Sequence, residues 1–134
     1  MLVGRSHECD FPAEIADRPV LTSQVTHAAT SAEIDQQVRE ALKDGSSGAG
    51  LYRLDVAGLR ALQPDVILTQ DLCEVCSIDL RTVQRLAADM NPAPRIVNLN
   101  PGSLMDVLDD LLRVGEAVGL EAGAQQAMVA MRER

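Results

Sequence analysis

Residues 51–90 read LYRLDVAGLRALQPDVILTQDLCEVCSIDLRTVQRLAADM, and this stretch decides the fold. Asp55 can accept hydrogen bonds from the first free amides of a helix over Val56–Leu62, and Pro64 stops that helix. Residues 65–70 hold three consecutive large apolar side chains between a proline and polar residues. So short an apolar run predicts a strand that is buried on both faces.

A second helix and a second strand follow, over 80–88 and Arg95–Leu99. The helix is indicated by apolar residues at 83, 86, 87 and 90, which lie on one face. Two strands joined by a helix can be parallel neighbours, and such a crossover is almost always right-handed. The polar loop DLCEVCS (71–77) then lies at the carboxyl edge of the sheet, where open α/β folds bind ligands. The sequence therefore predicts an α/β fold.

On the N-terminal side, the sequence pattern indicates fewer regular elements. Met1–Gly4 is typical of the end of a strand, and residues 20–29 show no period and predict an extended loop. Thr30 and Glu33 form a capping box for a helix whose apolar stripe runs through Ile34 and Leu42. Residues 51–54 are expected to pair briefly with another segment before the helix at Val56.

Two more helices are predicted after the second strand. Ser103 can cap the first of them, and Asp106 is favourable in its first turn. Its buried face is expected to contain Leu104, Leu108, Leu111, Leu112 and Val118. Residues 122–134 are helical by propensity.

Composition limits the function classes. The chain has 134 residues, a hydrophobic fraction of 46%, an aromatic fraction of 1% and a net charge of −8. Binding to nucleic acid or to an anionic membrane needs a positive field, so this charge argues against both. No apolar run approaches the roughly 20 residues that span a bilayer. No signal peptide is recognisable, so a chain that is complete as given would be cytoplasmic.

The order of motifs resembles a known family. The matching stretches are LVGRSHECDFP (2–12), LYRLDVAGLRALQPDVILTQ (51–70), LCEVC (72–76) and PRIVNLNPGSLMDVLDDLLRVGEAVG (94–119). They resemble the class III substrate-binding proteins of ABC importers, the helical-backbone metal receptors. The pair SHECDFP and LCEVC is similar to the branch called cobalamin-binding proteins.

The resemblance implies a three-layer lobe with a mostly parallel open sheet flanked by helices. Residues 1–121 would form part of an N-terminal lobe, and 122–134 would begin a long inter-lobe helix. The ligand would be cobalamin, haem or a ferric siderophore, held between two lobes and passed to an ABC permease. No chemistry would be performed on it. The resemblance places such a protein in the periplasm or another extracytoplasmic compartment.

Ligand contacts are expected in groups of residues that directly follow predicted strands. The expected ligand-binding residues are Ser6, His7, Glu8, Gln70, Asp71, Leu72 and Asn100. The acidic residue that would dock the lobe onto a permease falls at Asp79. Glu8, Asp10, Asp71 and Glu74 surround the same edge and could contact a cationic ligand group, or they could be solvated loop charges.

A soft-metal cluster is the sharpest chemical motif. His7, Cys9, Cys73 and Cys76 offer an imidazole and thiolates, which suit zinc, and C-x-x-C is a chelating spacing. Alternatively the cysteines pack as small apolar groups, or Cys73 and Cys76 form a redox dithiol at a helix start. The second function class is therefore a small metal- or thiol-dependent enzyme that uses this cluster.

Self-association is expected as well. In the resembled family a strand precedes the segment that matches Leu2–Gly4 and a second lobe follows the last helix, and neither is in this chain. An open strand edge is a template for another strand. The last helix also carries Ala124, Met128 and Met131 near one face. We therefore expect a two-fold homodimer.

Overall fold

The computed structural model of the chain describes residues 1–24, 30–43, 52–70 and 78–133. In chain order the elements are η1 (Ala13–Ile15), β1 (Thr22–Gln24), α1 (Ser31–Lys43), β2 (Tyr52–Leu54), α2 (Val56–Leu62), β3 (Val66–Gln70), α3 (Leu80–Ala88), β4 (Arg95–Leu99), α4 (Leu104–Ala117) and α5 (Glu121–Arg132). This mixture of helices and small sheets confirms the α/β class.

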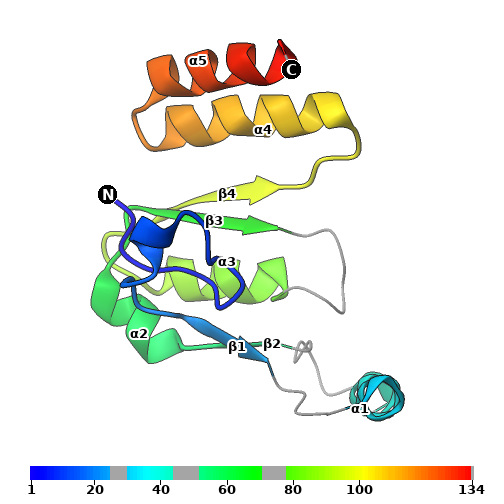
Figure 1. The fold of residues 1–134 in the computed structure, drawn as a ribbon. Coiled ribbons are helices and arrows are strands. Elements are labelled where there is room, and N and C mark those ends of the chain that lie inside the picture. Colours follow the sequence, from blue (N-terminus) through cyan, green and yellow to red (C-terminus); the bar gives the residue numbers. More distant parts are fainter. Residues whose placement is uncertain (25–29, 44–51, 71–77, 134) are drawn as a thin grey trace.

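The strands β3 and β4 form a parallel pair, as the sequence predicts. Their register runs from Val66 opposite Arg95 to Gln70 opposite Leu99, with α3 as the connection between them. In Figure 1 α3 lies below this pair, α4 lies above it, and α5 lies on the far side of α4. The strand pair is therefore flanked by helices on both sides.

Three predicted helix caps are present with the expected chemistry. Asp55 accepts a hydrogen bond from the amide of Gly58 at 2.9 Å at the start of α2. At α1 the Glu33 carboxylate accepts from the Thr30 amide at 3.0 Å, and the Thr30 hydroxyl accepts from the Glu33 amide at 3.3 Å. Each cap satisfies an amide that the helix itself leaves without a partner. The Ser103 hydroxyl does the same for α4.

The N-terminal part of the fold differs from the prediction in two respects. The predicted loop over 20–29 contains β1, which pairs antiparallel with β2, so the described strands form one parallel and one antiparallel pair. The predicted strand at Met1–Gly4 is wrong, because these residues form none. Only Arg5 makes a bridge, in parallel with Val20.

The core is small, and most of its residues lie on β4 and on the flanking helices α3 and α4. The buried apolar side chains in the described residues are Leu59, Val83, Ala87, Val97, Leu108 and Ala124. Val97 and Leu68 are register partners on the same face of the sheet, but Leu68 is 45% exposed. The prediction that this strand is buried on both faces is therefore wrong, since α4 packs on β4 and leaves Leu68 half uncovered.

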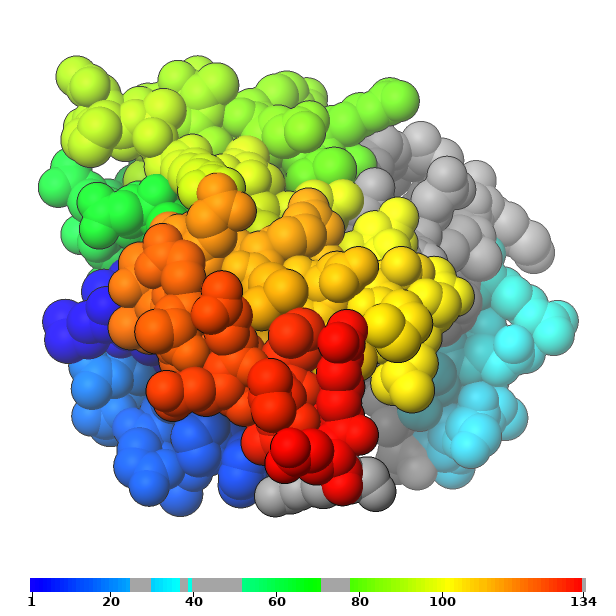
Figure 2. Space-filling model, turned by 90° about the horizontal axis from the view of Figure 1, so that it is seen from above, coloured from blue at the N-terminus to red at the C-terminus, as the bar shows by residue number. Residues whose placement is uncertain are grey.

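Helices α4 and α5 pack closely on each other, and Figure 2 shows them side by side on the face seen from above. A Cβ atom added at the buried Gly115 would overlap with the Cβ atom of Ala124. The predicted buried face of α4 is only partly correct. Leu108 is buried, but Leu104 is 76% exposed and Val118 is 45% exposed.

Candidate functional site

The structure places the predicted ligand-binding residues in two groups. Ser6, His7 and Glu8 lie on the loop after Arg5, and their partners come from β1 and β2. Gln70 ends β3, and Asn100 directly follows β4, so both lie at the carboxyl edge of the parallel pair. Among the described residues no hydrogen bond or ion pair joins one group to the other.

One side of the His7 ring contacts the Thr22 hydroxyl, which in turn contacts the Ser6 hydroxyl. Thr22 Oγ1 accepts a hydrogen bond from the His7 backbone amide at 3.0 Å and lies 2.6 Å from His7 Nδ1. The Thr22 hydroxyl donates to Ser6 Oγ at 3.1 Å. A hydroxyl has one proton, so when Thr22 donates it to Ser6, Nδ1 donates to Thr22. In that arrangement the neutral ring carries its proton on Nδ1 and its lone pair on Nε2.

The other side of the His7 ring faces Glu8 and Tyr52. The Nε2 atom is buried, has no hydrogen-bond partner among the described residues, and lies 4.0 Å from Glu8 Oε1. Tyr52 donates from its hydroxyl to the same Glu8 oxygen at 3.2 Å. The His7 and Tyr52 rings are 5.1 Å apart at a tilt of 49°. An imidazole nitrogen, a carboxylate oxygen and a phenol hydroxyl therefore lie close together.

Tyr52 is a site residue that sequence reasoning missed. It is the single tyrosine of the chain, and it stands on β2, whose pairing with β1 brings it to the loop that holds His7. A lone tyrosine in a chain with so few aromatic residues was a usable signal. The pairing partner was not predictable, because β1 has no alternating pattern.

The carboxyl edge of β3 and β4 is polar and open. Gln70 and Asn100 are both exposed. Beside them the amide of Gly102 donates to Asp106 at 2.9 Å, and the Asp106 amide donates to the Ser103 hydroxyl at 3.2 Å. The Ser103 side chain thus satisfies one amide of the helix start, and Gln70 and Asn100 present exposed amide side chains at this edge.

Only part of the predicted cysteine cluster lies within the described residues. Cys9 is a free, exposed thiol. Cys73 and Cys76, together with the expected ligand residues Asp71 and Leu72, lie outside the described residues. Within residues 1–24, 30–43, 52–70 and 78–133, no three histidine, cysteine or acidic side chains gather as metal ligands. The four-ligand zinc site stays a prediction.

Asp79 has a structural role at the start of α3. Its carboxylate accepts from the amides of Arg81 and Thr82, both at 3.2 Å, and from the Thr82 hydroxyl at 3.2 Å. These bonds make it the N-cap of the helix. A role in docking a permease stays a prediction.

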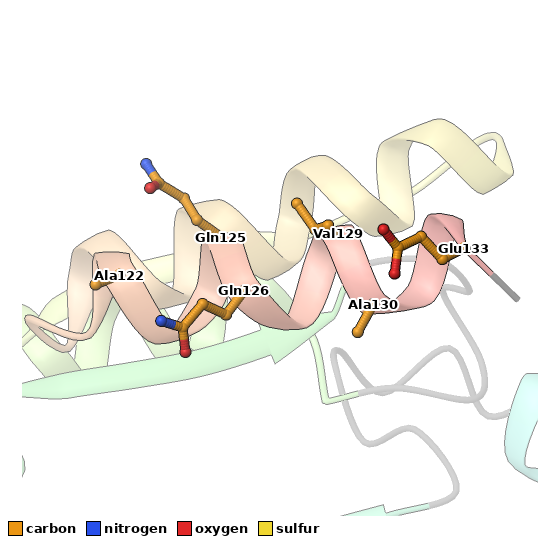
Figure 3. Close-up of a pocket in the computed structure, with 6 residues that line it drawn as sticks. All are labelled: Ala122, Gln125, Gln126, Val129, Ala130 and Glu133. Atoms are coloured by element: carbon orange, nitrogen blue, oxygen red, sulfur yellow. The ribbon is translucent and has the colours of Figure 1, made fainter.

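Two surface hollows lie away from all of these residues. One, of about 480 Å³, follows a single face of α5, and Figure 3 shows the six side chains that line it. Those residues are Ala122, Gln125, Gln126, Val129, Ala130 and Glu133. The other, of about 190 Å³, lies at the opposite edge of the parallel strands, beside Gln63, Asp89 and Pro92. Neither contains a predicted ligand-binding residue.

In the part of the chain that the structure describes, none of the helices combines the length and the apolarity that a membrane crossing requires. Comparison with protein-family models, with curated proteins and with solved structures found no match, so the function has to be argued from the site.

Proposed function

We propose that the chain is a substrate-binding lobe of an ABC importer for a metal chelate, with cobalamin as the ligand that suits it best. The observation that carries the proposal is the carboxyl edge of β3 and β4. Exposed amide side chains, Gln70 and Asn100, stand there at the ends of adjacent parallel strands. Open α/β sheets bind ligands at this edge.

The chemistry of the two side chains favours one ligand class. Gln70 and Asn100 are uncharged, and each can both donate and accept hydrogen bonds. The rim of cobalamin carries primary amides, which pair with such groups in either direction. Haem presents carboxylates instead, and the net charge of −8 would repel them.

The finer architecture belongs to the same proposal. The helices on both sides of β3 and β4 would be the outer layers of a three-layer lobe, with residues 1–121 in the lobe. Residues 122–134 would begin the inter-lobe helix, and Asp79 would face the permease in addition to capping α3. The protein would work outside the cytoplasm. The resemblance in the sequence supports this part.

The alternative function, a small metal- or thiol-dependent enzyme, depends on Cys73 and Cys76 together with His7 and Cys9. Two of these four residues lie outside the described part of the chain. No contact among the described residues favours the enzyme over the binding lobe.

Equilibrium dialysis with cyanocobalamin tests the proposal, with its visible absorbance as the readout. We expect saturable binding at one ligand per chain. Asn100→Ala removes one neutral hydrogen bond, worth about 0.5–1.5 kcal/mol, so affinity should fall about 2- to 12-fold. Asn91→Ala is the matched control, because Asn91 is exposed and lies at the opposite edge of the strands. Equal losses in both variants, or no retention by the wild type, would contradict the proposal.

A further inference from the structure

We propose that His7 and Glu8 hold a divalent transition-metal ion, with Thr22 and Tyr52 positioning the two ligands. This site differs from the predicted cysteine cluster because it needs no thiolate. It also differs from the edge of β3 and β4 on which the cobalamin proposal rests, because the described contacts of its residues are with β1 and β2.

The nitrogen ligand of the proposed site is His7 Nε2. When Nδ1 donates to Thr22, the lone pair of the neutral ring is on Nε2, where a metal can bind. This Nε2 atom is buried without a hydrogen-bond partner among the described residues. A buried polar atom without a partner is rare in proteins, and a bound ion or water is a common reason for one. Neutral imidazole is a preferred ligand of zinc, copper, iron and nickel.

The distance between the two ligand atoms allows one ion to bind both. Zinc bonds are about 2.0–2.1 Å to imidazole and about 2.0–2.2 Å to carboxylate, so the two together span at most about 4.0–4.3 Å. His7 Nε2 and Glu8 Oε1 are 4.0 Å apart. A tetrahedral angle would need them closer, and the Glu8 side chain, which is 61% exposed, is free to approach.

The surrounding groups are those that usually support metal ligands. A metal-binding histidine almost always donates its other ring N–H to an acceptor, and a metal-binding carboxylate is itself hydrogen-bonded. Here Nδ1 lies 2.6 Å from the Thr22 hydroxyl, which can accept its proton, and Tyr52 donates to Glu8 at 3.2 Å. Thr22 also donates to Ser6, which fixes its orientation. Both ligands therefore have an oriented partner before any ion arrives.

The burial of the site predicts an exchangeable ion. The His7 side chain is 22% exposed and Glu8 is 61% exposed, so one ligand lies inside and the other lies at the surface. The described residues supply two ligands, and water would fill the other positions. The net charge of −8 favours the approach of a cation.

Titration of the metal-free protein with cobalt(II) chloride, followed by absorption, tests the proposal, and zinc chloride competition gives the zinc affinity. We expect one equivalent of cobalt with weak d–d bands and no thiolate-to-cobalt charge-transfer band. His7→Gln should abolish binding, and His27→Gln, which changes the other histidine of the chain, should not. Thr22→Val and Tyr52→Phe should each weaken binding about 10- to 100-fold.

Two results would overturn the proposal. One is a strong charge-transfer band that disappears in the Cys9→Ser, Cys73→Ser, Cys76→Ser variant, because the thiolates would then be the ligands. The other is unchanged affinity in His7→Gln. Since His7→Gln could disturb folding, Tyr52→Phe, which keeps the ring, and nitrogen NMR of the wild-type histidines provide independent checks. The NMR must show the Nδ1–H tautomer for His7, and an Nε2–H tautomer would refute the assignment. Dialysis with cyanocobalamin is a separate measurement, so failure of one proposal does not imply failure of the other.

Discussion

Replacing Gly115 with alanine tests how α5 is held on α4. A Cβ atom at this position would overlap with that of Ala124 and would lie 3.3 Å from the Leu120 carbonyl oxygen. Carbon atoms pack at about 3.5–4.0 Å, and both overlapping atoms are attached to backbone, so the helices must move apart by about an ångström or more. Such overpacking costs about 1–3 kcal/mol.

The same substitution also has a favourable effect, which must be subtracted. Alanine is better than glycine in a helix by about 0.8–1.0 kcal/mol, so the net loss of stability should be up to about 2 kcal/mol. For a chain of this length, a loss of about 2 kcal/mol corresponds to a fall in Tm of roughly 8 °C. Thermal and urea melts followed by far-UV circular dichroism measure the change directly.

Gly123→Ala is the matched control for this experiment. Gly123 lies in α5, and nothing stands within 4 Å of an added Cβ atom there. This variant should gain about 0.5–1 kcal/mol from helix propensity alone. The two alanines should therefore shift stability in opposite directions. If Gly115→Ala is as stable as Gly123→Ala, the close packing of α4 on α5 is refuted.

Three other predictions concern stability and assembly. Asp79→Ala should cost about 1 kcal/mol through loss of the α3 cap, whereas Asp79→Asn, which keeps one acceptor oxygen, should cost less. Equal losses of stability in urea melts of both variants would contradict the capping role. Val97→Asp buries an unpaired charge and should cost several kcal/mol, whereas Leu68→Asp on the same face should cost far less because Leu68 is 45% exposed. Sedimentation velocity at micromolar concentration should show a dimer that dissociates in a Leu104→Lys, Met131→Lys variant, and a cooperative, stable wild-type monomer would exclude it.

The local chemistry of helix starts made much of the fold predictable. Asp55, Thr30 and Ser103 each stand directly before a helix, and each accepts from the amide predicted for it. The strand β3 was predictable for a similarly local reason, because Pro64 and the apolar run that follows it are adjacent in the sequence. Asp79 offered the same signal before α3, although the sequence analysis assigned it a docking role alone.

The extent of burial was not predictable from periodicity. A period of 3.6 residues identifies the inward face of a helix, but it contains no information on the length of the element beneath. With about 1.5 Å per residue, α4 is about 21 Å long, whereas the five residues of β4 span about 17 Å. The helix is therefore longer than the strand, and Leu104 at its start and Val118 directly after its end are exposed.

The site around His7 depends on contacts between distant segments, so the sequence could give its ligands but not its arrangement. Thr22 and Tyr52 reach His7 because β1 pairs with β2 across 28 residues or more of chain, from Gln24 opposite Tyr52 to Thr22 opposite Leu54. The three residues of β1, TSQ, do not show the alternation of apolar and polar residues that indicates a strand. Two of the predicted cysteines lie outside the described residues, so that part of the site stays a prediction.

The measurement that tests the proposed function most directly is an amide NMR spectrum of the protein titrated with cyanocobalamin. A ligand held at the carboxyl edge of the parallel strands should shift the signals of Gln70, Asn100 and Gly102 progressively and to saturation. The amides of Gln63 and Asp89, beside the hollow at the opposite edge, should stay in place. Shifts confined to that opposite edge, or no shifts at any ligand concentration, would contradict a ligand site at the ends of β3 and β4.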